Sequence, residues 1–454
     1  MKSILTLFAL AAALQLTAQK WTTAELSEAR FHSSMATNGQ VLVIAGGVKG
    51  QNTAYSDRVD IYDAATGIWA QAQLPSKRSW MASASAGDKV IFAGGFELDT
   101  VSGADIFIDA VEIYDVKTKT WSSQKLPLGP RGYMRGIGVG KKAYFMGGFS
   151  DPAMAMATTT VQIYDTETGA WSSGANIPFT SGLAAIAVFG KKIMLKRSAI
   201  YGVYDTETDS WESQAFPAAT PFRPSPVVTP TEVWMVGGYN GADFSGSNHI
   251  LKYNIATKTW ADAAPLLVSR CFTAAAFLNG KVIIGGGAYE DSFSPDVTTD
   301  LVEIYDTLTG TWDTQFMLSK PRGYLDYQET APVICNRAFF PGGDLSEGME
   351  TSRVDIYTDT SAVGTFLPKL PEASFGISPS PCRDFVEISL RLPVGETGWL
   401  TICDAQGRSF FKQKIQPGSP PELAIDTKDW PSGSFVATVS TTRGVRAKPL
   451  VKVK

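Results

Sequence analysis

Histidine and cysteine are scarce in this chain. Among 454 residues there are two histidines, His32 and His249, and four cysteines, Cys271, Cys335, Cys382 and Cys403. No two cysteines have CxxC spacing, which argues against a zinc site, and a serine or cysteine hydrolase that depends on histidine is poorly supplied. We therefore predict no metal and no cofactor. Two alternatives stay open for the cysteines: four free thiols, or a Cys382–Cys403 disulfide.

A strong charge imbalance and long apolar runs are also missing. The net charge of -4 gives no indication of a nucleic-acid partner, and no segment after residue 18 is apolar enough to span a membrane. The first eighteen residues differ, because Lys2 precedes an apolar run and Ala18 offers a small residue for cleavage. Since that run is short, we expect residues 1–18 to be a secretory signal peptide rather than an anchor, and the mature protein to be secreted.

One phrase recurs along the chain. VDIYDAATGIW (59–69) returns as VEIYDVKTKTW (111–121), VQIYDTETGAW (161–171) and VEIYDTLTGTW (302–312). Alignment on its tyrosine gives seven units, at Tyr62, Tyr114, Tyr164, Tyr204, Tyr253, Tyr305 and Tyr357. Six units have a diglycine before the tyrosine, and six have a tryptophan after it. The fourth unit has Lys196-Arg197 in place of the diglycine, and the seventh lacks the tryptophan.

Each unit is predicted to form a four-stranded antiparallel sheet. A tight Gly- or Asn-containing turn joins the first two strands, and an Asp-to-Gly turn joins the tyrosine strand to the tryptophan strand. One such sheet cannot bury both faces, but seven packed in a ring can, with Tyr and Trp between neighbours. The spacing, diglycine, tyrosine and tryptophan together resemble the kelch repeat family. The resemblance implies an all-β, seven-bladed propeller over residues 19–362, or six blades if the fourth unit forms none.

The missing seventh tryptophan has a candidate near the other end of the propeller. Trp21 stands before the first complete unit. We expect Trp21 to lie on a strand that completes the seventh sheet beside the strand at 354–358. This pairing would join the two ends of the propeller and remove an open sheet edge.

The C-terminal part of the chain reads as a separate small unit. Residues 363–376 are predicted to be a linker, and residues 377–454 a small antiparallel β-sandwich. The last acidic residue is Asp429, and the end carries alternating lysines. From the residues alone, an accessory sandwich that binds sugar or matrix is possible.

This unit resembles the C-terminal sorting domain (Por) of the type IX secretion system. The resemblance rests on the Pro-x-Pro entry at Pro379 and Pro381, the DxxGR turn at 404–408, the PSG-aromatic strand at 431–435 and the lysine-rich end. Ser380, Cys403 and Phe435 depart from the residues usual in that family. The resemblance implies export through the type IX secretion machinery and removal of the tail. The protein would then be extracellular or attached to the outer-membrane surface of a Gram-negative bacterium.

The alternating strand directions sort the connections onto two faces of the predicted propeller. The tight turns lie on one face, here named the turn face. The long segments after the diglycines, and the connections into the first strands, lie on the other, here named the loop face. Variable loops on a rigid frame favour the loop face as the ligand-binding side, and its mixture of acidic and aromatic residues would suit a glycan.

Six arginines precede first strands on the loop face, most with an aromatic residue within two positions. The ligand-binding candidates are Arg30, Arg78, Arg131, Arg223, Arg270, Arg322, Trp80, Tyr133 and Tyr324. A cationic ring at the channel mouth would attract carboxylate or phosphate. In the other interpretation, which we favour for most of the six, each arginine is part of the repeat and hydrogen-bonds loop carbonyls.

Two enzyme classes share the kelch propeller. Copper-radical oxidases need a histidine beside a tyrosine, whereas His32 follows Phe31 and His249 follows Asn248. Sialic-acid mutarotases work with arginine and acidic groups, and no motif here singles them out. No catalytic residue is therefore predicted. We expect a protein- or glycan-binding module, with a sialic-acid-type mutarotase or epimerase acting in the central pocket as the alternative.

Overall fold

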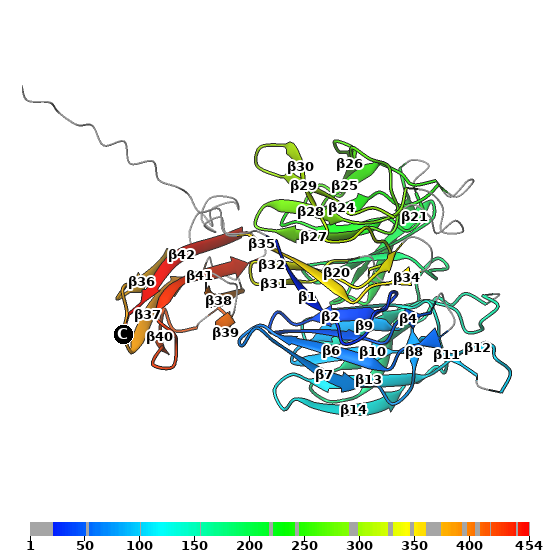
Figure 1. Ribbon diagram of the computed structural model, residues 1–454, viewed down its shortest axis with the longest axis horizontal. Coiled ribbons are helices and arrows are strands. Elements are labelled where there is room, and N and C mark those ends of the chain that lie inside the picture. Colours follow the sequence, from blue (N-terminus) through cyan, green and yellow to red (C-terminus); the bar gives the residue numbers. More distant parts are fainter. Residues whose placement is uncertain are drawn as a thin grey trace, which may run out of the picture.

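The computed structural model describes residues 21–453 apart from 51–53, 100, 155, 218–220, 241–244, 290–297, 326–329, 346–348, 360–373, 393–396, 405–408, 418 and 442–443. Every regular element within these residues is a β-strand (Figure 1). None of the described residues belongs to a helix that could cross a membrane. The predicted signal peptide and residues 363–373 of the predicted linker lie outside the described residues.

Seven four-stranded antiparallel sheets, numbered here in chain order, occupy Trp21–Thr358. Sheet 1 consists of β2 (Ser34–Thr37), β3 (Val41–Ala45), β6 (Arg58–Asp63) and β7 (Ile68–Gln73). Sheet 2 consists of β9 (Ala82–Ala86), β10 (Lys89–Ala93), β13 (Ala110–Asp115) and β14 (Thr120–Lys125). Sheet 3 consists of β15 (Arg135–Val139), β16 (Lys142–Met146), β17 (Val161–Asp165) and β18 (Trp171–Gly174). Sheets 4 and 5 consist of β19 (Ala185–Phe189), β20 (Lys192–Arg197), β21 (Ile200–Asp205), β22 (Ser210–Ala215); β23 (Ser225–Val228), β24 (Glu232–Val236), β25 (Ile250–Asn254), β26 (Thr259–Asp262). Sheets 6 and 7 consist of β27 (Ala274–Leu278), β28 (Lys281–Gly285), β29 (Leu301–Asp306), β30 (Thr311–Met317); β31 (Val333–Ile334), β32 (Arg337–Pro341), β35 (Arg353–Thr358), β1 (Trp21–Glu25).

The loop segments carry short strands of their own. These are β4 (Val48–Lys49) with β5 (Ala54–Tyr55), β8 (Arg78–Ser79) with β11 (Phe96–Leu98) and β12 (Asp105–Phe107), and β33 (Asp344–Leu345) with β34 (Met349–Glu350). They extend the loop face beyond the ends of the main strands.

The N-terminal strand completes the seventh sheet, as the sequence predicts. β1 pairs antiparallel with β35, and Trp21 lies opposite Tyr357. Their ring centroids are 5.1 Å apart. The tyrosine and tryptophan of the other six units lie 5.0–5.2 Å apart. Trp21 therefore fills the place that the seventh unit's own sequence leaves vacant.

The sheets contact one another through their first strands and through shared cores. β2 contacts β9, and the contacts continue through β15, β19, β23 and β27 to β31 and β32. Apolar clusters span neighbouring sheets: one joins Val43 to Phe92, and another joins Phe339 of sheet 7 to Leu42 of sheet 1. Gly343 N donates to Arg30 O at 3.1 Å, which links the last unit to the first.

The turn between the third and fourth strands forms for the predicted reason. Asp165 Oδ1 accepts hydrogen bonds from the backbone N–H of Glu167 (2.9 Å) and Thr168 (3.1 Å). Gly169 then takes a φ of 71°, which glycine adopts without steric cost. Asp63, Asp115, Asp205 and Asp306 accept equivalent bonds in their own turns.

Sheet 4 lacks a diglycine, and a lysine does part of its work. In sheets 1 and 2 the second glycine donates its N–H to the next unit, from Gly47 to Arg78 O and from Gly95 to Arg131 O. In sheet 4, Lys196 Nζ donates to Pro221 O at 2.5 Å. Burial lowers the pKa of Lys196 to about 8. A side-chain donor thus replaces a backbone donor, and β20 continues into β21 without a long loop.

Residues 374–453, here named the C-terminal domain, form two further sheets. One contains β36 (Ser374–Ser378), β37 (Phe385–Arg391) and β40 (Glu422–Asp426), and the other contains β39 (Ser409–Ile415), β38 (Gly398–Asp404), β41 (Gly433–Thr441) and β42 (Gly444–Lys452). Both contribute to one apolar cluster that includes Val386, Ile388, Leu400 and Val439. Residues 374–376, expected in the linker, belong to β36 because they pair with β37.

The C-terminal domain contacts the turn face. Ser409 N donates to Ala64 O at 3.0 Å, and Lys412 Nζ donates to Asn38 O at 2.8 Å. Ala64 and Asn38 lie in the two turns of sheet 1 on that face. Figure 1 shows the C-terminal domain on one side of the seven sheets and the β11–β12 hairpin on the opposite side. The loop face is therefore left uncovered by this domain.

Candidate functional site

Seven side chains occupy the same place in the seven units, where the channel opens onto the loop face. In six units the residue stands two positions before the first strand. All seven have a φ between 47° and 59°, an uncommon conformation for residues other than glycine. We name this set the mouth ring: His32, Trp80, Tyr133, Leu183, Arg223, Phe272 and Tyr324.

Six of the seven side chains of the mouth ring form a continuous run of contacts, from Arg223 through Phe272, Tyr324, His32 and Trp80 to Tyr133. The His32 ring lies 4.6 Å from that of Trp80 and 4.8 Å from that of Tyr324, centroid to centroid. Trp80 and Tyr133 are 4.8 Å apart, and Phe272 stacks on Tyr324 at 4.1 Å. Trp80, Tyr133 and Tyr324, all predicted as site residues, are half-buried here. The structure therefore brings the three aromatic candidates together.

A second layer of rings supports the mouth ring from behind. Phe96 and Phe149, each directly after a diglycine, pack on Tyr133 at 4.8 and 6.0 Å. Tyr239 packs on Phe272 at 5.6 Å. A left-handed backbone costs about 1–2 kcal/mol for a residue with a side chain, so this packing holds the seven residues in a conformation they would not take alone.

The mouth ring carries one cationic group. The guanidinium carbon of Arg223 lies 5.1 Å from the centroid of Phe272, in cation–π contact. Burial, and secondarily the charge of Arg223, lower the pKa of His32 well below its usual value. His32 is therefore neutral at physiological pH, and the ring presents aromatic surface beside one half-buried arginine.

The other five arginine candidates are buried beneath the loop face, which agrees with the interpretation that we favour for most of the six, in which each arginine is part of the repeat. Arg30 pairs with Asp60 at 2.6 Å, Arg322 with Asp355 at 2.5 Å, Arg78 with Glu112 at 3.5 Å, and Arg270 with Glu303. Arg131 hydrogen-bonds Thr160 and the carbonyl of Leu128. Because these side chains are shielded from solvent and bonded to the protein, they serve the repeat.

These pairs have a sequence signal next to the repeat tyrosine. Each carboxylate is the acidic residue two positions before the repeat tyrosine, as in VDIYD or VEIYD. The third unit keeps Arg131 but has Gln162 at that place, and the fifth unit has Leu251. The arginine position of the fifth unit is Pro221, so Arg223 stands two residues later, at the mouth-ring position.

The channel behind the mouth ring is uncharged along its described lining. A cavity of about 260 Å³ is lined by small and apolar residues of the first strands, such as Ser83, Gly136 and Ile186, together with Thr330 and Pro332. Arginine and a carboxylate do not converge in this lining. The structure therefore offers no support for the mutarotase alternative in the central pocket.

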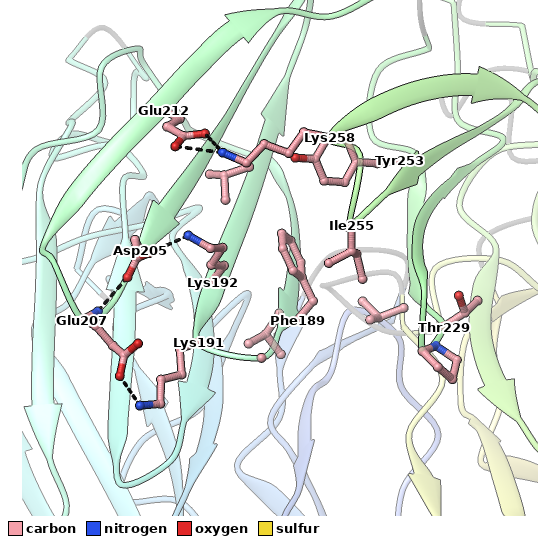
Figure 2. Close-up of a pocket in the computed structure, with 15 residues that line it drawn as sticks. Phe189, Lys191, Lys192, Asp205, Glu207, Glu212, Thr229, Tyr253, Ile255 and Lys258 are labelled. Atoms are coloured by element: carbon pink, nitrogen blue, oxygen red, sulfur yellow. Dashed lines mark hydrogen bonds and ion pairs between the residues drawn. The ribbon is translucent and has the colours of Figure 1, made fainter. Parts of the chain in front are cut away.

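A second cavity, of about 520 Å³, opens between sheets 4 and 5 on the turn face (Figure 2). Its apolar walls include Phe189, Ile255 and Tyr253. Its lysines are already paired, Lys192 with Asp205 at 2.5 Å and Lys258 with Glu212 at 2.7 Å, and Lys191 with Glu207 (Figure 2). The rim charges thus neutralise one another, which disfavours capture of a charged ligand.

Exposed aliphatic side chains on the loop face were not predicted. On and around the β11–β12 hairpin, Val101 is 93% exposed, Ile106 40% and Leu98 39%, and on the next loop Met156 is 61% exposed. The hairpin is formed by the antiparallel pairing of β11 with β12, and a 2.7 Å hydrogen bond from Tyr55 Oη to Asp105 links it to the neighbouring loop. The sequence predicts a long segment after Gly94-Gly95, but the exposure of its apolar residues depends on how the hairpin projects from the sheets.

Metal-binding geometry is not found among the described residues. No group of three or more His, Cys, Asp or Glu is placed to hold an ion in that part of the chain. His249 pairs with Asp262 at 2.6 Å. Three acidic residues of the long segments after the diglycines, Asp243, Glu290 and Asp291, lie outside the described residues.

Comparison with known proteins bears on the fold and the repeat. No protein-family model matches the chain. Alpha-scruin of Limulus polyphemus is 22% identical over 371 residues, which cover 78% of this chain and 35% of scruin. Kelch-like protein 36 of Mus musculus is 28% identical over 137 residues, covering 30% of this chain and 22% of that protein. Kelch-like protein terF of Aspergillus terreus is 26% identical over 149 residues, covering 31% and 32%.

These similarities support a kelch-type β-propeller. The chain spans about a third or less of the length of these relatives. Among solved structures, a fungal alcohol oxidase of the AA5 family in complex with copper matches with a TM-score of 0.58 and 14% identity, covering 96% of this chain and 99% of that chain. At that identity the likeness shows the propeller fold alone.

Proposed function

We propose that this chain is a seven-bladed kelch propeller that binds a protein partner on its loop face. The observation that carries the proposal is the exposed aliphatic surface of the β11–β12 hairpin beside the mouth ring. Exposed apolar patches on a soluble protein mark interaction sites. Val101 is almost wholly exposed, so its side chain does not stabilise the fold by being buried.

The composition of this surface suits a protein interface. Trp, Tyr and Arg are the residue types that supply most binding energy at such interfaces, and Trp80, Tyr133 and Arg223 stand half-buried in the mouth ring. The ring is rigid, because its backbone strain is held by packing, so little conformational entropy is lost on binding. The similarity to kelch proteins supports the same function.

The test compares capture by loop-face and turn-face variants. The full-length protein, immobilised, is exposed to surface and extracellular proteins of the producing organism, and retained proteins are quantified by mass spectrometry. We expect a partner whose recovery falls at least tenfold with Val101→Asp/Ile106→Asp. Recovery should be unchanged with the matched turn-face control Ile68→Asp/Leu308→Asp, since Ile68 and Leu308 are 64% and 60% exposed. Recovery that is equal for both variants would refute the proposal.

Glycan binding is the second candidate, and the mouth ring favours it. Half-buried aromatic faces beside a guanidinium can stack on sugar rings and bond carboxylate or hydroxyl groups. A glycan array probed with wild type, Trp80→Ala and Arg223→Ala separates the candidates. Binding that disappears in both variants would support a glycan, and binding indifferent to both would place any glycan elsewhere.

We further propose that residues 1–18 direct secretion and that the C-terminal domain, a β-sandwich, is a type IX sorting domain. The two-sheet arrangement and the Pro-x-Pro entry support this role. The test is mass spectrometry, under reducing conditions, of the protein outside the cell. We expect an N-terminus after Ala18 and loss of the C-terminal segment. A full-length extracellular chain that keeps its C-terminus would argue for an accessory domain instead.

A further inference from the structure

We propose that Cys335 and Cys403 form a disulfide that joins the turn face of the propeller to the C-terminal domain. The two residues lie on different domains and are separated by the predicted linker. Neither the repeat nor the sorting-domain resemblance calls for a cysteine at these places.

The C-terminal domain presents Cys403 to the propeller through one hairpin. Cys403 of β38 pairs with Ser409 of β39, where the register shifts between Ile402 and Cys403. Ser409 N donates to Ala64 O at 3.0 Å, and Lys412, further along β39, bonds Asn38 O at 2.8 Å. Two hydrogen bonds therefore fix the Cys403 hairpin on the turns of sheet 1.

The propeller presents Cys335 at the same spot. Cys335 packs against the apolar cluster that contains Ala64, Leu42 and Ile334. Ala64, whose carbonyl oxygen accepts the Ser409 N–H, therefore packs in the same apolar cluster as Cys335. The Cys335 thiol interacts with the Cys403 side chain and with Ser409 and Lys412 of the same hairpin.

The backbone at Cys335 sharpens the argument. Cys335 opens the two-residue turn between β31 and β32, with a φ of 54°. The same turn position holds Gly87, Gly140, Gly190 and Asn279 in other sheets, all at φ between 49° and 61°. Glycine and asparagine are the residues that favour this conformation. A cysteine in this backbone conformation is strained, and a role in a cross-link would account for a cysteine at this position.

The electrostatic surroundings favour thiolate chemistry. Hydrogen bonding with Cys403, and secondarily the charge of Lys412, lower the pKa of the Cys335 thiol against the opposing effect of burial. Cys335 and Cys403 are half-buried, whereas Cys271 and Cys382 are fully buried. Cys382 lies beside Thr427, with its Sγ 4.0 Å from the hydroxyl oxygen. The structure thus supplies a contact for Cys403 other than the Cys382 pairing left open by the sequence.

The reaction is a thiol–disulfide exchange with a small disulfide such as oxidised glutathione. The Cys335 thiolate attacks one sulfur, forming a mixed disulfide and releasing one glutathione thiolate, which takes up the proton that Cys335 lost. The Cys403 thiolate then attacks Sγ of Cys335, forming the protein disulfide and releasing the second glutathione, which takes up the proton from Cys403. Two protein thiols are oxidised, and one glutathione disulfide is reduced to two thiols.

The first test counts thiols and maps the bond. Full-length reduced protein is equilibrated with oxidised glutathione, denatured, alkylated and digested without reductant. We expect alkylated thiols to fall from four to two, and a peptide containing Cys335 to be linked to one containing Cys403. Cys335→Gly and Cys403→Ser should keep their remaining thiols, and Cys382→Ser should still form the bond. A Cys382–Cys403 peptide, or four alkylated thiols in wild type, would overturn the proposal.

The second test does not depend on peptide recovery. A protease site placed within residues 363–373 is cut after oxidation. On a non-reducing gel the two fragments should stay together in wild type and separate on addition of dithiothreitol. Cys335→Gly, which also relieves the strained φ and so preserves the turn, should separate without reductant. Separation of the oxidised wild-type fragments would contradict the cross-link.

Discussion

On the turn face, two-residue hairpins and Asp-to-Gly turns satisfy their own backbone, lysines pair with nearby carboxylates, and the C-terminal domain contacts sheet 1. On the loop face, seven residues are held at positive φ, and arginines are buried just below the surface. Both faces come from the same repeat. The difference shows that the regular features of the repeat stabilise the fold, whereas the residues on the loop face can vary.

The buried arginines make that division possible. Arg270 bonds the carbonyls of Gly286 (3.0 Å) and Leu301 (2.7 Å), the two ends of the loop that follows its diglycine. Its carboxylate partner Glu303 also accepts the N–H of Leu267. One ion pair therefore anchors two loop-face connections to the sheet. The exposed residues of each loop are not needed for that anchoring.

The largest expected effect separates the two kinds of arginine. Arg270→Ala leaves the Glu303 carboxylate buried without its partner, which typically costs about 3–5 kcal/mol of unfolding free energy. Arg223→Ala should cost less than about 1 kcal/mol, because Arg223 is half-buried, yet it should weaken loop-face binding. Urea unfolding followed by tryptophan fluorescence measures the free energy of unfolding of both variants. Equal losses for the two variants would mean that Arg223 is also structural.

Closure of the seventh sheet should come next in size. Trp21→Ala removes packing on Tyr357 at 5.1 Å and Phe340 at 5.8 Å, and it should cost about 2–4 kcal/mol, since the ring is partly exposed. Trp171→Ala is the matched control, with the same contact to its tyrosine inside the chain. Hydrogen exchange should quicken in β35 only for Trp21→Ala. Quickened exchange in β17 instead, or in neither strand, would speak against closure by β1.

The sequence predicts what the repeat makes regular. The Tyr–Trp pairs, the Asp-to-Gly turns and the pairing of Trp21 with the seventh unit follow from side-chain chemistry at fixed spacing, and the structure has all three. Only part of the mouth ring could be predicted. In the fifth unit Pro221 takes the arginine position, and Arg223 stands two residues later, at the mouth-ring position. The convergence of the mouth ring depends on seven positions that meet only when the ring closes.

Other features have no local signal. The exposure of Val101 depends on the projection of one hairpin. The contact of Cys335 with Cys403 depends on where the C-terminal domain sits. Both are set by tertiary arrangement, which no spacing within a repeat encodes. The pairing of four of the five buried arginines with the acidic residue of VDIYD or VEIYD has a sequence signal, since arginine and acid are missing together from the fourth and fifth units.

A carboxylate on the loop face should respond to pH in the opposite sense to those on the turn face. Burial, and secondarily Glu350, raise the pKa of Asp344 to about 7. The folded state therefore holds this proton more tightly than the unfolded chain, and stability falls as pH rises from about 4 to about 7. Asp344→Asn should gain about 1–2 kcal/mol at pH 8, after allowance for solvent screening, and nothing at pH 4. Thermal unfolding at both pH values measures the difference, and a gain at pH 4 would point to packing rather than charge.

The smallest effect completes the contrast on the turn face. The backbone N–H groups of Thr168 and Glu167 lower the pKa of Asp165. The carboxylate therefore contributes stability above its unfolded-state pKa, near 4, and loses it as pH falls through the lower folded-state value. Asp165→Ala should lower the melting temperature at pH 7 by less than the Asp344→Asn substitution raises it at pH 8, and the loss should shrink towards pH 3. Asp165→Asn, whose amide oxygen still accepts both bonds, should recover most of the loss. If Asp165→Asn were as unstable as Asp165→Ala, charge rather than hydrogen bonding would hold the turn, and the turn face would owe its stability to the same force as the buried arginine pairs.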